Sequence, residues 1–211
     1  MKFRDVLALV GREPVFASAL LLAGETPEAQ VRLQMSRWVA AGKLVQLRRG
    51  LYALAPAWRK VEPHPFVVAN ALQRGSYVSL QSALAFRGVI PEHVPVVTSV
   101  GPGRPHVVRN ALGSFQFNHL TSRLSFGYMR IEVAVRQFAF VACPEKALLD
   151  LVHLTAGGDA TAHLLSLRLQ NPEAVNPETL LDLARRSGKP KWLRAARRAV
   201  AVLAGERGEG V

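Results

Sequence analysis

Residues 26–54 read TPEAQVRLQMSRWVAAGKLVQLRRGLYAL and predict a helix over 27–41 that is followed at once by a short hairpin. Thr26 is a residue type that caps helix N-termini, Pro27 suits the first helical position, and Gly42 suits the position just past a helix end. Apolar side chains recur within the helix at the spacing of a single face, which predicts that this face is buried. They are Val31, Met35, Trp38 and Val39.

The predicted hairpin has a basic tip. Residues 43–47 and 51–54 have the composition of short strands, and Arg48, Arg49 and Gly50 form the turn between them. A capped helix directly followed by such a hairpin is typical of a winged helix-turn-helix, in which the helix enters the major groove of DNA and the hairpin lies on the backbone. The alternative is an amphipathic helix beside a structural hairpin whose arginines are only hydrated.

The balance of charge also favours a polyanionic partner. The 211-residue chain has a net charge of +12, and residues 1–60 contribute +6 of it from ten basic and four acidic residues. Seven basic residues between 185 and 198 are more simply a hydrated helix face than a second nucleic-acid or partner surface. A hydrophobic fraction of 49% and a charged fraction of 20% exclude a disordered chain.

Several features predict a cytoplasmic protein without a membrane span. Cys143 is the only cysteine, which excludes an intramolecular disulfide and a cysteine-based metal cluster and fits a reducing compartment. The apolar run over 15–23 resembles the core of a signal peptide, but Glu13 and Pro14 interrupt its basic start and no clean cleavage site follows. No run reaches the ~18 apolar residues of a membrane-spanning helix.

The order of the predicted elements gives an α+β fold class. Helices over 2–10 and 16–22 complete a winged helix-turn-helix domain over 1–58, and prolines between 56 and 65 mark its boundary. We expect a mixed α+β domain over 64–155 and a C-terminal helical extension over 156–211. The helices predicted after residue 58 are 65–73, 79–87, a helix that begins at Pro144, 159–170, 177–187 and 190–204. Leu154 is expected to face the core from the helix that begins at Pro144. The predicted strands are 94–100, 115–120, 128–135 and 138–142.

The chain contains no strong catalytic or metal-binding pattern, so we expect neither enzymatic activity nor a cofactor. The six histidines lack metal-ligand spacing, and the glycine-rich loop over 101–104 lacks the Lys-Ser/Thr pair that grips nucleotide phosphates. Glu145, Lys146 and Asp150 form the only carboxylate group near a lysine, and the helical spacing of Lys146 and Asp150 more simply predicts an ion pair. Cys143 is expected to be a small buried residue.

Six short motifs follow one another across about residues 1–155. They are RWV (37–39), GKL (42–44), RRGLYA (48–53), YVSLQSAL (77–84), GVIPE (88–92) and ACPEKALLDL (142–151). In this order they resemble the AbiEi family of antitoxins, from the type IV toxin–antitoxin systems of phage resistance. The resemblance implies an N-terminal winged helix that represses its own operon and a second domain that neutralises a nucleotidyltransferase-like toxin, often without a stable complex.

The resemblance also implies operator DNA as a partner and assigns roles to residues. In the recognition helix, glutamine suits adenine, arginine suits guanine and leucine can contact a thymine methyl group, while basic residues of the wing hold phosphates. The candidates are Gln30, Arg32, Leu33 and Arg37 on the helix and Lys43, Arg48 and Arg49 on the wing.

In the second domain, the polar residues of the matching motifs and of the glycine-rich loop are the candidates. We expect Ser79 to cap a helix and Glu145 to complement a helix start, which are structural roles. Two alternatives remain open: a DNA-binding enzyme related to nucleases or nucleotidyltransferases, and a plain winged-helix transcription factor with a ligand-sensing domain. The candidate residues are Tyr77, Ser79, Ser82, Arg104, Glu145, Lys146 and Asp150.

Overall fold

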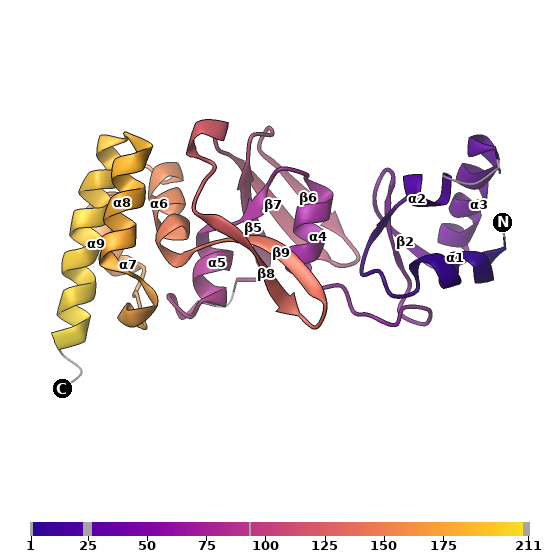
Figure 1. The fold of residues 1–211 in the computed structure, drawn as a ribbon, viewed down its shortest axis with the longest axis horizontal. Helices are drawn as coiled ribbons and strands as arrows, with labels where there is room; N and C mark the ends of the chain where they lie inside the picture. Colours follow the sequence, from indigo (N-terminus) through magenta and orange to yellow (C-terminus); the bar gives the residue numbers. More distant parts are fainter. Residues whose placement is uncertain (1, 23–26, 93, 209–211) are drawn as a thin grey trace.

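The structure is a computed structural model that describes residues 2–22, 27–92 and 94–208. These residues form a mixed α+β fold with two sheets, arranged along an elongated molecule (Figure 1). The N-terminal elements lie at one end, the larger sheet lies in the middle, and the C-terminal helices lie at the other end. The predicted N-cap residue Thr26 lies outside the described residues.

The N-terminal part consists of short helices and strands, which are α1 (Phe3–Val10), β1 (Phe16–Ala17), α2 (Ala19–Leu22), α3 (Glu28–Ala40), β2 (Leu44–Arg48) and β3 (Leu51–Leu54). The three strands form a sheet in the order β1-β3-β2. The prediction of one helix over 16–22 is wrong, because Phe16 and Ala17 pair with β3 and the helix begins only at Ala19. Phe16 reaches the core from this strand, so its apolar character reflects burial and not helical structure.

Helix α3 has nearly the predicted bounds. Pro27 is the N-cap residue and not the first helical residue, since its φ of −54° and ψ of 136° are not helical. Gly42 has a φ of +65°, which confirms its predicted place just past the helix. The predicted apolar face is covered, with Val39 half-buried and Val31, Met35 and Trp38 buried.

Two hydrophobic clusters make up the core of the described residues. The smaller cluster is formed by the N-terminal part and includes Val6, Val10 and Met35. Leu47 and Leu51 of the β2–β3 hairpin belong instead to the larger cluster, together with the central sheet. The hairpin therefore lies between α3 and the central sheet and does not project freely (Figure 1). Its assignment as the wing of a winged helix-turn-helix stays a prediction.

The central part contains α4 (Pro65–Leu72), β4 (Tyr77–Val78), α5 (Leu80–Phe86), β5 (Val96–Gly101), β6 (His106–Asn110), β7 (Gly113–His119), a 3-10 turn (Ser122–Leu124), β8 (Tyr128–Ala134), β9 (Gln137–Ala142) and α6 (Pro144–Leu154). Its sheet has the order β6-β7-β5-β4-β9-β8. The pairs β5–β7 and β4–β9 are parallel, and the others are antiparallel. Strand β6 was not predicted, because it is an edge strand whose side chains are largely exposed and carry no apolar alternation.

Some apolar residues of the central part lie outside its core. Met129 in β8 and Val135 just after it are 53% and 83% exposed. Strand β8 is the outer strand of the sheet, so only Ile131 and Val133 pack partly against the core. Leu154 was expected to face the core but is 40% exposed at the last turn of α6.

The C-terminal part is helical, with α7 (Thr161–Ser166), a 3-10 turn (Pro172–Ala174), α8 (Pro177–Ser187) and α9 (Pro190–Gly208). Helix α7 is shorter than the predicted 159–170, because Arg168 and Asn171 adopt a left-handed backbone conformation. Asn176 accepts hydrogen bonds from the backbone N–H groups of two residues in the first turn of α8, which confirms the predicted start. Within the described residues, no helix has both the length and the apolar character needed to cross a membrane.

Candidate nucleic-acid interface

The outward face of α3 carries the residues predicted to meet DNA bases. Its inward face is fixed by buried apolar side chains, so the opposite side chains are held in solvent. Leu33 is 53% exposed on this outward face. Arg32 forms an ion pair with Glu28 one turn earlier, and the exposure of both groups makes this pair weak. The exposed candidates are Gln30, Arg32, Leu33 and Arg37.

The outward face of α3 and the β2–β3 turn meet in one depression. We call it the helix–turn cavity; it has a volume of about 240 Å³. Arg32 from α3 and Arg49 from the turn both line it, so two arginines far apart in the sequence border the same hollow. Ser36, one turn after Arg32 on the helix, donates a hydrogen bond to the carbonyl of Arg32 at 3.1 Å. The lining residues are Ser18, Arg32, Met35, Ser36, Arg49, Gly50 and Tyr52.

The other two basic residues expected on the wing do not line this cavity. Lys43 precedes β2, at the far end of the strand from the turn, and its ammonium lies 5.0 Å from the ring centre of Phe3 and 5.9 Å from that of Trp58. Arg48 is directed towards the central part, where its guanidinium donates to the carbonyl of Ala71 at 3.4 Å. The structure therefore separates the three predicted phosphate contacts into three environments.

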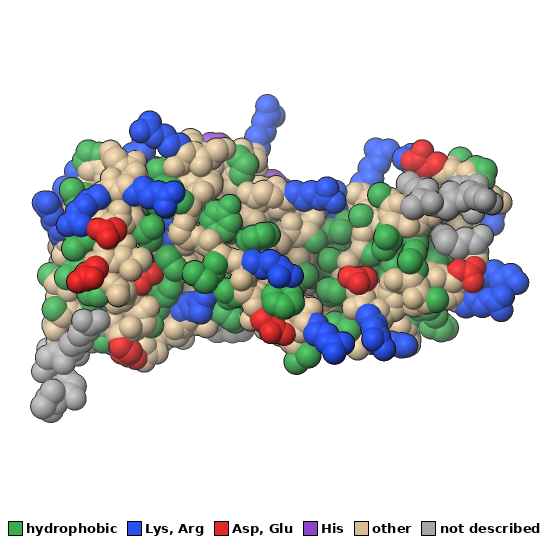
Figure 2. All heavy atoms as spheres, in the orientation of Figure 1, with side chains coloured by type: hydrophobic (Ala, Val, Ile, Leu, Met, Phe, Trp, Pro, Cys, Tyr) green, Lys and Arg blue, Asp and Glu red, His purple; other side chains and the backbone are tan. Residues whose placement is uncertain are grey.

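Charge by itself does not single out α3. On the face drawn in Figure 2, Lys and Arg side chains occur along the whole length of the molecule, over the C-terminal helices as well as over the N-terminal elements. Several C-terminal cations have internal partners: Lys191 donates to the carbonyl of Thr155 at 2.6 Å, and Arg194 donates to Asp159 at 2.8 Å. These contacts favour the structural interpretation of the C-terminal basic residues.

Four candidates of the second domain form one buried polar cluster, consisting of Tyr77, Ser79, Lys146 and Asp150. The predicted ion pair between Lys146 and Asp150 is present, and neither side chain has any exposed surface. Tyr77 and Ser79 donate to the same carboxylate oxygen of Asp150 at 3.0 and 2.8 Å, and Lys146 donates to the Tyr77 oxygen at 2.8 Å. The cluster therefore joins β4 and the start of α5 to α6 through charge-assisted hydrogen bonds.

Burial controls the protonation of this cluster. It raises the pKa of Tyr77, helped by the neighbouring Asp150 carboxylate, so the phenol stays neutral and can donate. It also lowers the pKa of Lys146 and raises that of Asp150, and the attraction between the two groups opposes both shifts. The Lys146 ammonium lies 4.9 Å from the ring centre of Trp192 and 5.5 Å from that of Phe126. These two aromatic neighbours follow no spacing rule and were missed by the sequence analysis.

Ser79 serves the cluster and not the predicted helix cap, and the other three candidates of the second domain lie outside the cluster. Ser79 occupies the N-cap position of α5, but its hydroxyl makes no capping bond and serves the Asp150 carboxylate, so the predicted capping role is wrong. Ser82 accepts a hydrogen bond from the Thr98 backbone at 2.8 Å, and Arg104 is exposed on a loop. Glu145 is buried and accepts from the backbone N–H of residue 176 at 2.7 Å, which ties α6 to the start of α8.

The thiol and the carboxylates singled out in the sequence are poorly accessible in the structure. Cys143 is half-buried and not fully buried as expected. Desolvation by its surroundings raises the pKa of its thiol to about 12, so the thiol is protonated at neutral pH. The described ranges hold no group of three or more His, Cys, Asp or Glu side chains placed to bind a metal ion. The carboxylates nearest a lysine, Glu145 and Asp150, are only 5% and 0% exposed.

Comparison with known proteins shows a likeness in fold. No protein-family model and no curated protein sequence matches the chain. The crystal structure of the RV2827C protein from Mycobacterium tuberculosis is similar in fold, with a TM-score of 0.55 and 15% sequence identity. The match covers 95% of this chain and 80% of that one, so it extends over the N-terminal, central and C-terminal parts together.

Proposed function

We propose that the chain is a DNA-binding autorepressor and antitoxin of a type IV toxin–antitoxin system, acting in the cytoplasm on operator DNA and against a nucleotidyltransferase-like toxin. The observation that carries the DNA-binding part is the helix–turn cavity. Arg32 and Arg49 border it from two elements, beside the exposed face of α3. Paired cations on a concave surface suit the phosphates of a duplex, and exposed Gln and Arg side chains on a helix suit base edges.

The antitoxin part is supported by the motifs that resemble the AbiEi family. Residues from two of these motifs, 77–84 and 142–151, meet in the buried polar cluster. Because the cluster is inaccessible, we assign it to the stability of the central part and not to contact with a toxin. The same burial argues against the nuclease alternative, in which the carboxylates would have to reach a substrate.

DNA binding can be tested by fluorescence anisotropy with a duplex taken from upstream of the reading frame. We expect the double variant Arg32→Gln/Arg49→Gln to weaken binding and to lower the slope of log K against log salt by about 2, roughly one per lost phosphate contact. The matched control is Arg109→Gln, on edge strand β6, which removes an exposed charge away from the cavity. An equal loss of DNA affinity in the double variant and in Arg109→Gln would show that the helix–turn cavity is not the DNA-binding surface.

Antitoxin activity can be tested by co-expression with a nucleotidyltransferase-type gene from the adjacent reading frame. We expect the full chain to restore growth, and we expect Arg32→Gln/Arg49→Gln to restore it equally, because repression and neutralisation are assigned to different parts. Failure of the wild-type chain to restore growth would leave a plain transcription factor as the better reading.

A further inference from the structure

A cavity lies where the N-terminal part meets the central sheet. We call it the junction cavity; its volume is about 650 Å³, within the range of ~300–1,000 Å³ typical of small-molecule sites. Three segments contribute to it: the loop after α1, the connector after β3, and the turn between β8 and β9. The sequence analysis did not identify this site, because its walls come from segments with no shared motif.

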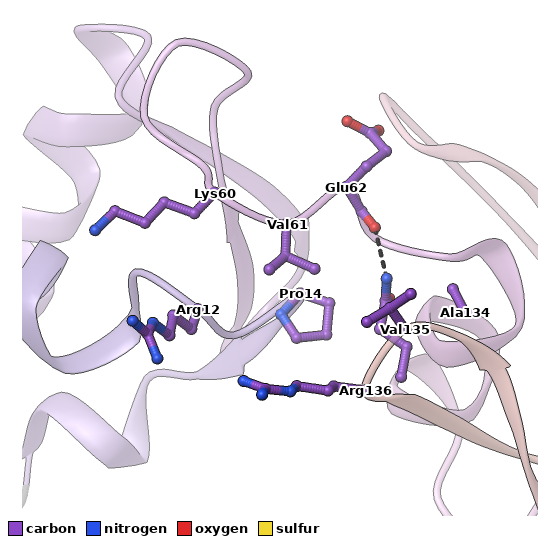
Figure 3. Close-up of a pocket in the computed structure, with 9 residues that line it drawn as sticks. Arg12, Pro14, Lys60, Val61, Glu62, Ala134, Val135 and Arg136 are labelled. Carbon is purple, nitrogen blue, oxygen red and sulfur yellow. Dashed lines mark hydrogen bonds between the residues drawn. The ribbon is translucent and has the colours of Figure 1, made fainter.

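Three cations surround this cavity without an acidic partner. Arg12, Lys60 and Arg136 are exposed, and none of them has an ion pair within the ranges that the structure describes. The acidic side chain in the lining, Glu62, is already paired with Arg59. Figure 3 shows the charged ends of the three cations directed to the same side. The three cations therefore border one cavity without a side-chain ion pair in the described ranges.

An apolar surface lies beside the charges. Pro14 and Val61 line the cavity and lie between Arg12 and Val135 in the view of Figure 3. Val135 joins this lining and is 83% exposed, the largest exposure of any large apolar residue that the structure describes. Pro14, Val61 and Val135 therefore give the cavity an apolar part beside its cations.

The frame of the cavity is held by specific hydrogen bonds. The buried Gln137 side chain donates to the carbonyl of Glu62 at 2.9 Å and accepts from the His64 backbone at 2.8 Å, which fixes the connector to β9. Arg136 has a φ of +58°, an unfavourable conformation for a residue with a Cβ, and its N–H donates to Glu132 at 2.7 Å. Arg136 lies in the two-residue turn between the paired Ala134 and Gln137, and tight hairpin turns commonly contain a residue with positive φ.

We propose that the junction cavity binds a small organic phosphate of nucleotide size. The phosphate would lie among Arg12, Lys60 and Arg136, since guanidinium groups match phosphate oxygens in paired hydrogen bonds and the combined charge suits a dianion. The apolar body would cover Pro14, Val61 and Val135. This proposal goes beyond DNA binding and does not depend on it, because the cavity and the helix–turn cavity share no lining residue.

The test is calorimetric titration of the full chain with adenosine 5′-monophosphate, and with adenosine as the phosphate-free control. We expect the monophosphate to bind and adenosine to bind at least tenfold more weakly. Arg12→Gln and Lys60→Gln should each weaken monophosphate binding several-fold, whereas Arg109→Gln should leave it unchanged. Arg136→Gly should weaken binding while raising the unfolding temperature, because glycine accepts the positive φ without strain.

Three results would overturn the proposal. They are no heat of binding for the monophosphate at millimolar concentration, equal affinity for adenosine, or an equal loss in Arg109→Gln. A duplex DNA titration separates a second source of the same chemistry: if Arg12→Gln and Lys60→Gln weaken duplex binding while the monophosphate does not bind, the cations contact the DNA backbone. Loss of DNA binding in the Arg32→Gln/Arg49→Gln variant tests the proposed function only. It would not overturn monophosphate binding at the junction cavity.

Discussion

Arg48 and Arg49 are adjacent in the chain but face different environments, since Arg49 lines the helix–turn cavity while Arg48 donates to the carbonyl of Ala71 in the central part. Of these two arginines, only Arg49 is therefore expected to bind a phosphate. We predict that Arg49→Ala weakens operator binding and lowers the salt slope by about 1, whereas Arg48→Ala leaves the slope unchanged. Salt titrations of the two single variants, followed by anisotropy, measure this difference.

The two variants control for each other, because they remove the same group from adjacent positions. Arg48→Ala is expected to act on stability, through the lost bond to Ala71, by less than about 1 kcal/mol at this exposed site. If Arg48→Ala changes the slope as much as Arg49→Ala does, both arginines contact DNA and the hairpin must move away from the central part on binding.

The sequence analysis was correct where neighbouring residues alone determine the secondary structure. The Asn176-Pro177 helix start and the left-handed Gly42 both follow from the backbone preferences of single residues. The segment over 16–22 failed because its fate depends on pairing with β3, much later in the chain. Apolar composition alone could not distinguish a short buried strand from a helix there.

The candidate sites show the same division between local and distant interactions. The spacing of Lys146 and Asp150 predicted their ion pair, since both lie on one helix. Their partners Tyr77 and Ser79 are 73 and 71 residues from Asp150, and only the assembled sheet brings them together. The junction cavity depends on three loops, so no sequence pattern could have predicted it.

The buried polar cluster predicts a large effect on stability. Asp150→Ala removes one partner of a fully buried ion pair and leaves the Lys146 ammonium uncompensated. We expect the free energy of unfolding to fall by about 3–5 kcal/mol. Urea denaturation monitored by tryptophan fluorescence measures the change, and Trp192 beside Lys146 provides a probe near the cluster.

A double variant separates the ion pair from simple packing. Lys146→Met/Asp150→Leu replaces both charges by apolar groups, so much of the stability lost in Asp150→Ala should return. Because Tyr77 would keep its buried hydroxyl, Tyr77→Phe added to this background should stabilise it further. A loss below about 1 kcal/mol in Asp150→Ala would mean that water reaches the cluster.

The environment of His64 leads us to predict that the stability of the fold depends on pH. Its Nδ1 accepts from the Phe66 backbone at the start of α4, and burial lowers its pKa below the ordinary value of 6.5. The folded state therefore binds a proton at His64 less readily than the unfolded chain does. The stability that neutral His64 contributes is fully present above pH 6.5 and is lost as the pH falls through the lowered pKa. Urea denaturation at several pH values should show stability falling below neutrality.

The matched variant for this effect is His64→Asn, which keeps a capping acceptor but cannot titrate. Its stability should decline less between pH 7 and pH 5 than that of the wild-type chain. Part of the decline should remain, because burial and the nearby Lys189 and Lys191 also lower the pKa of His153. An identical decline in His64→Asn would assign the whole effect to other groups.

The basic C-terminal helices predict a structural role that can be separated from DNA binding. Lys191 donates to the carbonyls of Thr155 and His153 at 2.6 and 3.4 Å, which places a cation at the C-terminal end of α6. We expect Lys191→Met to lower the free energy of unfolding by about 1 kcal/mol and to leave operator affinity unchanged. Arg197→Gln is the control, since Arg197 is exposed and has no hydrogen bond or ion pair within the described ranges. A fall in operator affinity in both variants, without a change in stability, would instead identify these helices as a second nucleic-acid surface.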